Sequence, residues 1–114
     1  MTVKPQDCMV TAFVGNTKIA EAEKVWIMNE VAHIIINPVY YFHSQNVLSE
    51  VLAPSSLTTR CPLKGDASYY HIDLNGERIE NAAWAYNNPI AEAEVIKGLM
   101  AFDPRAVVIK NQRG

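Results

Sequence analysis

The sequence has few of the residues that build cross-linked or metal-bound small proteins. It contains 2 cysteines and 3 histidines in 114 residues. Cys8 and Cys61 cannot form a disulfide-rich scaffold, and alone they cannot supply the ligand set of a structural zinc site. Lysine and arginine total 10 against 12 acidic residues, a net charge of −2. This balance argues against a surface that binds nucleic acid through many phosphates.

Long apolar segments and nucleotide-binding motifs are also missing. The longest apolar run, residues 31–36, includes His33 and is much shorter than the roughly 20 residues that cross a bilayer. Residues 1–7 have no apolar stretch typical of a secretory signal. No phosphate-binding glycine loop or nucleophilic serine elbow occurs. We therefore expect a cytoplasmic protein that does not act in a membrane, folded as a single domain over residues 1–114.

Turn signals divide the chain into short strand-like segments. Gly15-Asn16 and Asn75-Gly76 each separate two segments rich in β-branched or aromatic residues, which is the pattern of a β-hairpin. Residues 53–56 are expected to form a loop. Further strands are predicted at residues 24–29, 39–42, 82–86, 99–102 and 106–109.

One helical stretch is predicted at residues 89–98. Ile90, Ala93 and Ile96 are spaced to share one face of a helix, and Gly98 can end it. Many short strands with little helix are typical of an antiparallel sandwich or a partly closed barrel. The predicted fold class is all-β, or mainly β with one short helix, arranged as two antiparallel sheets.

The densest group of chemically active residues lies around a Cys-Pro-Leu-Lys-Gly string. Pro62 holds Cys61 in an extended conformation, and Gly65 permits a turn that other residues resist. We expect this bend to bring Cys61, Lys64 and Asp66 close together.

Positive charge near the sulfur is the feature that indicates a chemical role for this string. Lys64 and Arg60 would favour the thiolate of Cys61, the form that a nucleophilic or redox cysteine requires. The alternative is a buried thiol beside a tight turn, which is common for free cysteines. No histidine lies next to Cys61 in the sequence to act as its base.

Aromatic residues form a second group. Neighbours on a strand face opposite sides, so Tyr40 and Phe42 share one face and Tyr41 takes the other, while Trp84 and Tyr86 share a face. If these faces converge, they form an apolar pocket with hydroxyl groups, suited to a flat or cationic ligand. The alternative is that the rings only fill the core.

Taken in order, these strings resemble a known family. The segments are Val39–Phe42, Cys61–Tyr69, Ala83–Tyr86 with Pro89, and Gly98–Phe102. Over residues 10–109 the chain resembles the domain-of-unknown-function family numbered 427, which is also filed under a nucleotidyltransferase label. The resemblance implies two antiparallel sheets that face a cleft, of the Mss4-like or β-tent type. It implies no settled function, and the metal-binding carboxylates of nucleotidyl transfer are not visible in the sequence.

The resemblance also implies a set of hallmark positions. They are Glu30, Tyr40, Tyr41, Cys61, Lys64, Gly65, Tyr69, Trp84 and Tyr86. The chain departs from the family at His43, where a proline is usual, at Asn46, where an aspartate is usual, and at Leu63, where an aromatic residue is usual. These departures point to a different ligand or a lower activity. The paired CxxC zinc ligands of β-tent proteins are absent, so we expect neither a metal nor a cofactor.

Three functional hypotheses follow, and the sequence leaves open whether the protein is an enzyme. The first is a pocket for an unknown small molecule, with Cys61 and Lys64 as catalytic residues. Its ligand-binding residues would be Glu30, Tyr40, Tyr41, Tyr69, Trp84 and Tyr86. The second is a non-catalytic module whose aromatic cleft receives a peptide or a modified side chain, and the third is a purely structural motif. No nucleic-acid partner is expected, and a homo-oligomer paired through an edge strand is compatible with the pattern.

Overall fold

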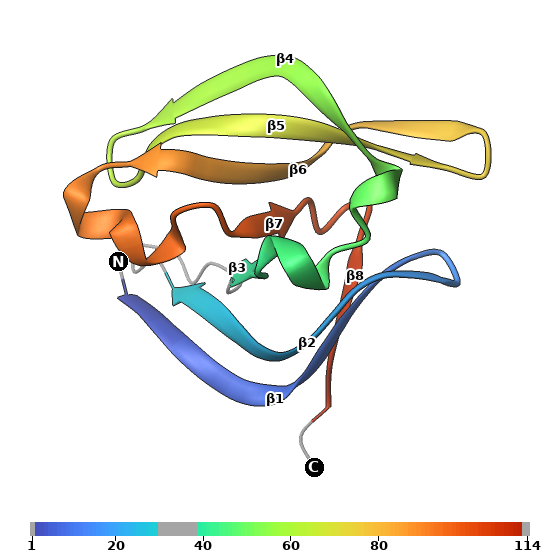
Figure 1. Cartoon of the computed structure of the whole chain (residues 1–114), viewed down its shortest axis with the longest axis horizontal. Coiled ribbons are helices and arrows are strands. Elements are labelled where there is room, and N and C mark those ends of the chain that lie inside the picture. Colours follow the sequence, from blue (N-terminus) through green and yellow to red (C-terminus); the bar gives the residue numbers. More distant parts are fainter. Residues whose placement is uncertain (1, 30–38, 113–114) are drawn as a thin grey trace.

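The described part of the chain, residues 2–29 and 39–112 of the computed structural model, contains eight strands (Figure 1). The strands are β1 (Thr2–Val14), β2 (Thr17–Asn29), β3 (Val39–Tyr41), β4 (Leu52–Cys61), β5 (Gly65–Leu74), β6 (Glu77–Pro89), β7 (Met100–Phe102) and β8 (Val108–Gln112). Three short 3-10 helices accompany them: η1 (Ser44–Asn46), η2 (Ser49–Val51) and η3 (Ala91–Ile96). In this part of the chain no helix is long and apolar enough to span a membrane.

The strands form two antiparallel sheets, which confirms the predicted fold class. One sheet has the order β3-β2-β1-β8 and the other the order β4-β5-β6-β7. Figure 1 shows the curved β1–β2 hairpin on one side of the molecule and β4, β5 and β6 on the other. The more specific Mss4-like or β-tent assignment stays a prediction.

The two sheets meet at a seam between β3 and β7. The Phe42 N–H donates to the Met100 carbonyl, and the Met100 N–H donates to the Phe42 carbonyl, both at 2.8 Å. Because neighbouring residues on a strand face opposite sides, Tyr41 and Phe42 enter different apolar clusters, and so do Ala101 and Phe102. The seam therefore separates two clusters.

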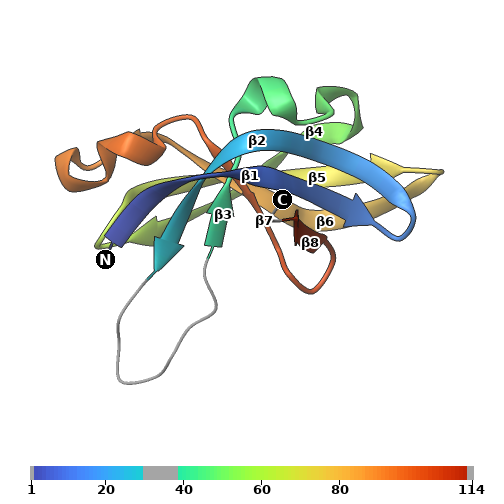
Figure 2. The ribbon, with the colours of Figure 1, turned by 90° about the horizontal axis from the view of Figure 1, so that it is seen from below.

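The main cluster lies between the sheets. Its buried members include Val10, Val25, Phe42, Ile72, Ala83 and Phe102. The Phe42 and Phe102 rings meet edge to face, with centroids 5.7 Å apart. Val47 and Val51, from the η1–η2 segment, and Val107, from the link between β7 and β8, also belong to this cluster. Figure 2 shows these two segments on opposite sides of the molecule, so they close the main cluster from both ends.

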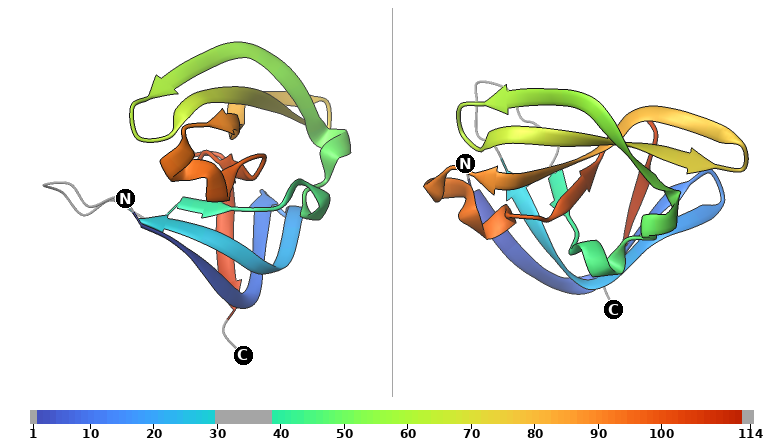
Figure 3. Two further views of the ribbon diagram at one scale, coloured as in Figure 1. Left: turned by 60° about the vertical axis from the view of Figure 1, so that its left-hand side comes forward. Right: turned by 45° about the horizontal axis from the view of Figure 1, so that its top comes forward.

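The second cluster lies on the other side of the seam and is called the aromatic cluster here. Its buried members are Met28, Tyr41, Ala67, Tyr86, Ala93, Ile96, Leu99 and Ala101. Its half-buried members are Trp26, Val39, Cys61, Tyr69, Trp84 and Ile90. η3 supplies Ala93 and Ile96, and Figures 1 and 3 show it beside the turn between β4 and β5.

Both predicted hairpins are present. β1 and β2 join at Gly15-Asn16, and β5 and β6 join at Asn75-Gly76. Asn75 and Gly76 have positive φ values of 53° and 79°, as a type I′ turn requires. The local turn signal was therefore sufficient to place these two hairpins.

One local prediction was wrong, and the predicted helix is shorter than expected. Residues 53–56, expected to form a loop, belong to β4, whose register against β5 shifts between Pro54 and Thr58. An edge strand tolerates Pro54 because one side of its backbone needs no partner. The helical stretch predicted at 89–98 is present as the shorter 3-10 helix η3. β6 continues to Pro89 and Tyr86 pairs with Lys97, so strand pairing limits the helix on both sides.

The predicted face of that stretch is nevertheless correct. Ala93 and Ile96 are fully buried and Ile90 packs against the same cluster. Gly98 ends the segment with a φ of 73°. The apolar run at 31–36 and Glu30 lie outside the described residues.

Candidate functional site

The Cys-Pro-Leu-Lys-Gly string forms the tight turn between β4 and β5. Cys61 ends β4 and pairs with Gly65, the first residue of β5. The Lys64 N–H donates to the Cys61 carbonyl at 3.1 Å, and the Ile90 N–H donates to the Lys64 carbonyl at 2.8 Å. The second bond ties the turn to the end of β6, so the backbone of Lys64 is held from both sides.

Gly65 is required by both its conformation and its surroundings. Its φ is 113°, in the region that other residues rarely adopt. A Cβ at this position would lie 3.2 Å from the Ile90 nitrogen and 3.2 Å from the Pro89 Cα. The glycine therefore allows the turn to approach the β6 backbone, and this close approach orients Lys64.

The side chain of Lys64 is directed toward the aromatic cluster. The residue is only 8% exposed, and its Nζ lies 5.7 Å from the centroid of the Tyr86 ring. This is a cation–π geometry, which gains strength when the charge is shielded from water. Burial raises the pKa of Tyr86 to about 12, against the opposing effect of the Lys64 charge. The phenol is therefore neutral at pH 7 and adds no negative charge beside Lys64.

Two half-buried rings lie at the outer side of the cluster. Tyr69 and Trp84 are opposite each other on β5 and β6, with ring centroids 6.2 Å apart and an interplanar angle of 42°. The Tyr69 hydroxyl and the Thr59 hydroxyl are hydrogen-bonded at 3.1 Å. Cys61 is a half-buried free thiol in contact with the same cluster. The two rings, the thiol and the ammonium group thus lie in one region, in which both rings and the thiol are half-buried.

Arg60 and Asp66 are not part of this region, contrary to the prediction that they would lie near Cys61. They form an ion pair with each other at 3.2 Å, and their side chains are 66% and 67% exposed. Each precedes a residue that contacts the aromatic cluster, and strand alternation turns it to the opposite face. Lys64 and Cys61, by contrast, both act electrostatically on the Tyr86 hydroxyl.

The structure brings together most of the residues singled out from the sequence. Tyr41, Cys61, Tyr69, Trp84 and Tyr86 belong to the aromatic cluster, and Lys64 lies over the Tyr86 ring. Tyr40 is not among them: it pairs with Ile27 on β2 and packs against the main cluster. Glu30 lies outside the described residues.

Two large side chains of β2 belong to the aromatic cluster although they were not singled out from the sequence. Trp26 and Met28 lie on β2, and Trp26 pairs with Tyr41 across the β2–β3 ladder. Their spacing of two residues shows that they share a face of the strand. This signal was present in the segment 24–29, but the sequence does not reveal which cluster that face meets.

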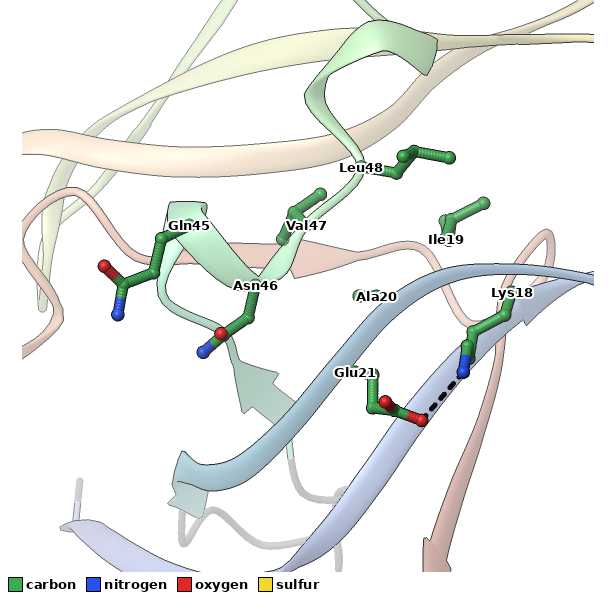
Figure 4. A pocket seen from close by; sticks show the side chains of 8 residues that line it. All are labelled: Lys18, Ile19, Ala20, Glu21, Gln45, Asn46, Val47 and Leu48. Carbon is green, nitrogen blue, oxygen red and sulfur yellow. Dashed lines mark hydrogen bonds and ion pairs between the residues drawn. The ribbon is translucent and has the colours of Figure 1, made fainter.

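A separate hollow lies on β2, away from the aromatic cluster (Figure 4). It has a volume of about 260 Å³ and lies between β2 and η1. Figure 4 shows Gln45 and Asn46 from the η1 segment and Lys18 and Glu21 from β2 around it. Lys18 and Glu21 are paired at 2.8 Å, so their charges compensate each other. None of the residues singled out from the sequence as site residues lines this hollow.

Comparison with known proteins gives a family but no activity. Within residues 2–29 and 39–112, no group of three or more His, Cys, Asp or Glu side chains is arranged to hold a metal ion. Among curated proteins, none matches the chain. A family model described as "Domain of unknown function (DUF427)" matches residues 2–112. This match covers nearly the whole sequence, and the chain belongs to the DUF427 family.

Proposed function

We propose that the protein binds a small organic anion with a flat apolar body at the aromatic cluster. The observation that carries this proposal is the position of Lys64. Its charged group lies over the Tyr86 ring, inside a cluster whose outer rings, Tyr69 and Trp84, are only half-buried. Ligand sites typically combine apolar walls with a few fixed polar groups of this kind. The anionic group would meet Lys64 and the flat body would cover the outer rings.

The charge of Lys64 favours this ligand over the second hypothesis. An aromatic cleft that receives a modified side chain usually binds a cation, such as a methylated lysine, through its ring faces. Here the Lys64 ammonium group already lies over the Tyr86 ring. A second cation at the same rings would be repelled. An anionic ligand instead gains a charge-assisted hydrogen bond.

Cys61 is the residue we propose as a reactive group at this site, as a nucleophile or a proton donor. Its support is proximity: the thiol is free and half-buried, and it contacts the same cluster as the Lys64 side chain. A thiol reagent such as 5,5′-dithiobis(2-nitrobenzoate), applied over a range of pH, tests this role. Reaction only near the ordinary thiol pKa of about 8.5 would remove the nucleophile assignment. We keep a cytoplasmic location as part of this proposal, since a free thiol is typical of reducing compartments.

Intrinsic fluorescence provides a direct test of binding. The chain has 2 tryptophans, and both contact the aromatic cluster, so any change in their emission reports on this site. The probes are 1-anilinonaphthalene-8-sulfonate and N-phenyl-1-naphthylamine, which share their ring system and differ by the sulfonate. We expect the sulfonate probe to bind more tightly to the wild-type chain.

The variant Lys64→Met removes the charge and keeps an apolar side chain. We expect its affinity for the sulfonate probe to fall by about tenfold or more, because a hydrogen bond to a charged group is lost, while its affinity for the neutral probe stays the same. Lys97→Met, on the exposed end of η3, is the matched control and should change neither affinity. Equal affinities of the two probes for the wild-type chain, or equal losses in both lysine variants, would contradict the proposal.

A further inference from the structure

Two β-bulges flank β5 at successive residues of one face: the bulge of β4 lies opposite Tyr69 and the bulge of β6 lies opposite His71. Pro54 pairs with Tyr70 and Thr58 pairs with Ser68, so β4 has two more residues than β5 between these pairs. Ile79 pairs with Ile72 and Ala83 pairs with Tyr70, so β6 also has two more residues than β5 between these pairs. β5 is therefore flanked on both sides by extra residues. Bulges re-aim side chains and are over-represented next to active sites.

Hydrogen bonds connect the two bulges across β5. The Ser55 hydroxyl donates to the Asn81 Oδ1, although their strands are separated by β5. The Asn81 backbone N–H donates to the His71 Nδ1 at 3.0 Å. The Leu57 N–H donates to the Ser55 oxygen at 3.1 Å. Asn81 adopts a left-handed φ of 54°, a conformation that costs energy and that often persists at functional sites.

This network leaves two N–H donors with fixed positions. Because His71 accepts a hydrogen bond at Nδ1, its neutral ring carries the proton on Nε2, on the other side of the imidazole. Because the Asn81 Oδ1 accepts from Ser55, the amide NH₂ of Asn81 is the part of that side chain left to donate. All three residues are half-buried. The donors are thus pre-oriented rather than free to rotate.

The donors lie on the same face as the aromatic rings. Ala67 and Tyr69 contact the aromatic cluster, whereas Tyr70 and Ile72 contact the main cluster. Since β5 has no extra residue of its own, His71 shares the face of Tyr69. Two residues along a strand span about 7 Å. A molecule that covers the Tyr69 and Trp84 rings therefore reaches the donors with its far end.

The surrounding charges determine to which kind of oxygen these N–H groups would donate. Asp73 and Arg78 are bound to each other by two hydrogen bonds at 2.6 and 2.7 Å, and Glu80 is exposed nearby. The local balance is therefore not positive. A second anionic group would be disfavoured here. A neutral carbonyl oxygen accepts two N–H donors without this penalty.

We infer that Ser55, His71 and Asn81 form a subsite for a carbonyl oxygen, so that the ligand is a planar ring compound with an anionic group at one end and an amide or lactam carbonyl at the other. This inference rests on the proposed function and specifies its ligand class. It assigns binding to residues on two bulges that lie outside the Cys-Pro-Leu-Lys-Gly string.

A pair of carboxylates tests the subsite. The probes are quinoline-6-carboxylate and 2-oxo-1,2-dihydroquinoline-6-carboxylate, which differ by the lactam at the end opposite the carboxylate. Tryptophan fluorescence gives both affinities. We expect the wild-type chain to bind the lactam about fivefold to tenfold more tightly, as one added hydrogen bond would give.

Two asparagines with the same backbone conformation provide a matched control. Asn81 has a φ of 54° and Asn75, at the tip of the β5–β6 hairpin, has a φ of 53°. Both accept glycine without backbone strain. We expect Asn81→Gly to abolish the lactam preference and Asn75→Gly to retain it. Ser55→Ala, which frees the Asn81 oxygen to turn outward, should also reduce the preference and serves if Asn81→Gly does not fold.

The outcomes separate this subsite from the proposed function. Equal affinity of the wild-type chain for the two carboxylates overturns the subsite. So does a lactam preference that survives both Asn81→Gly and Ser55→Ala. If neither carboxylate binds while the sulfonate probe still depends on Lys64, only the subsite is lost. If the sulfonate probe shows no such dependence, the proposed function fails and the subsite fails with it.

Discussion

Replacing Gly65 with alanine should destabilise the protein more than the same change at any of its other described glycines with a positive φ. The φ of 113° alone places alanine in a sparsely populated region, at a cost of about 1–3 kcal/mol. The new Cβ would also lie 3.2 Å from the Ile90 nitrogen and the Pro89 Cα. Both are backbone atoms of a paired strand end, so they cannot rotate away, and overpacking of this kind costs about 1–3 kcal/mol. We expect a loss of about 2–6 kcal/mol in the free energy of unfolding.

Gly76→Ala is the matched control for this experiment. Gly76 has a φ of 79°, and a Cβ at this position would meet no atom within 4 Å. Its substitution carries the conformational cost without the contact, which we expect to be about 1–2 kcal/mol. Urea unfolding, followed by tryptophan fluorescence at pH 7, gives both values. If the two variants lose the same free energy, the close approach of the β4–β5 turn to the end of β6 does not constrain the fold, and our account of how Lys64 is oriented is refuted.

Two further predictions follow from individual side chains. Tyr86 has a folded-state pKa of about 12 against 10.0 for the free group, so its contribution to stability is complete below pH 10 and is lost between pH 10 and 12. Between these limits the free energy of unfolding of the wild-type chain should therefore fall by about 1.4 kcal/mol per pH unit more than that of Tyr86→Phe. Denaturant unfolding at pH 9 and pH 11 measures both values, and equal decreases in the two chains would contradict the prediction. The Arg105 side chain and backbone hydrogen bonds lower the pKa of Asp103, so Asp103→Ala should cost about 1 kcal/mol at pH 7, and this difference should shrink as the pH falls below about 4. A deficit in Asp103→Ala that persists unchanged at pH 2 would show that the carboxylate charge is not its cause.

The features that the sequence predicted correctly depend on near neighbours. Asn75-Gly76 placed a hairpin because the turn needs positive φ at adjacent residues. Trp84 and Tyr86 were assigned to one face because strand geometry alone decides it, and both rings contact the aromatic cluster. The buried face of residues 90–96 was correct for the same reason, although the helix there is shorter than predicted. Each of these inferences used a spacing of a few residues.

The features that the sequence did not predict depend on pairing between distant segments. Alternation correctly separated Tyr40 from Tyr41, but it did not show that Tyr41 faces the aromatic cluster and Tyr40 the main cluster. That assignment follows from the bonds between Phe42 and Met100, which join segments far apart in the chain. The bulges at Ser55 and Asn81 are equally non-local. A bulge exists only relative to a partner strand whose register is fixed on both sides of it.

Substitution of Lys64 distinguishes the hypothesis that the Cys-Pro-Leu-Lys-Gly string is purely structural from the hypothesis that it binds a ligand. The turn uses the backbone of this residue, through the bonds to Cys61 and Ile90, and a methionine side chain leaves these bonds intact. Lys64→Met removes the desolvation cost of the ammonium group together with its electrostatic interactions, the contact with the Tyr86 ring among them. If the string served the fold alone, Lys64→Met would impair nothing except stability. We expect instead a variant that still unfolds cooperatively in urea and has lost sulfonate binding. A variant that unfolds more readily and still binds the sulfonate probe would favour the structural hypothesis.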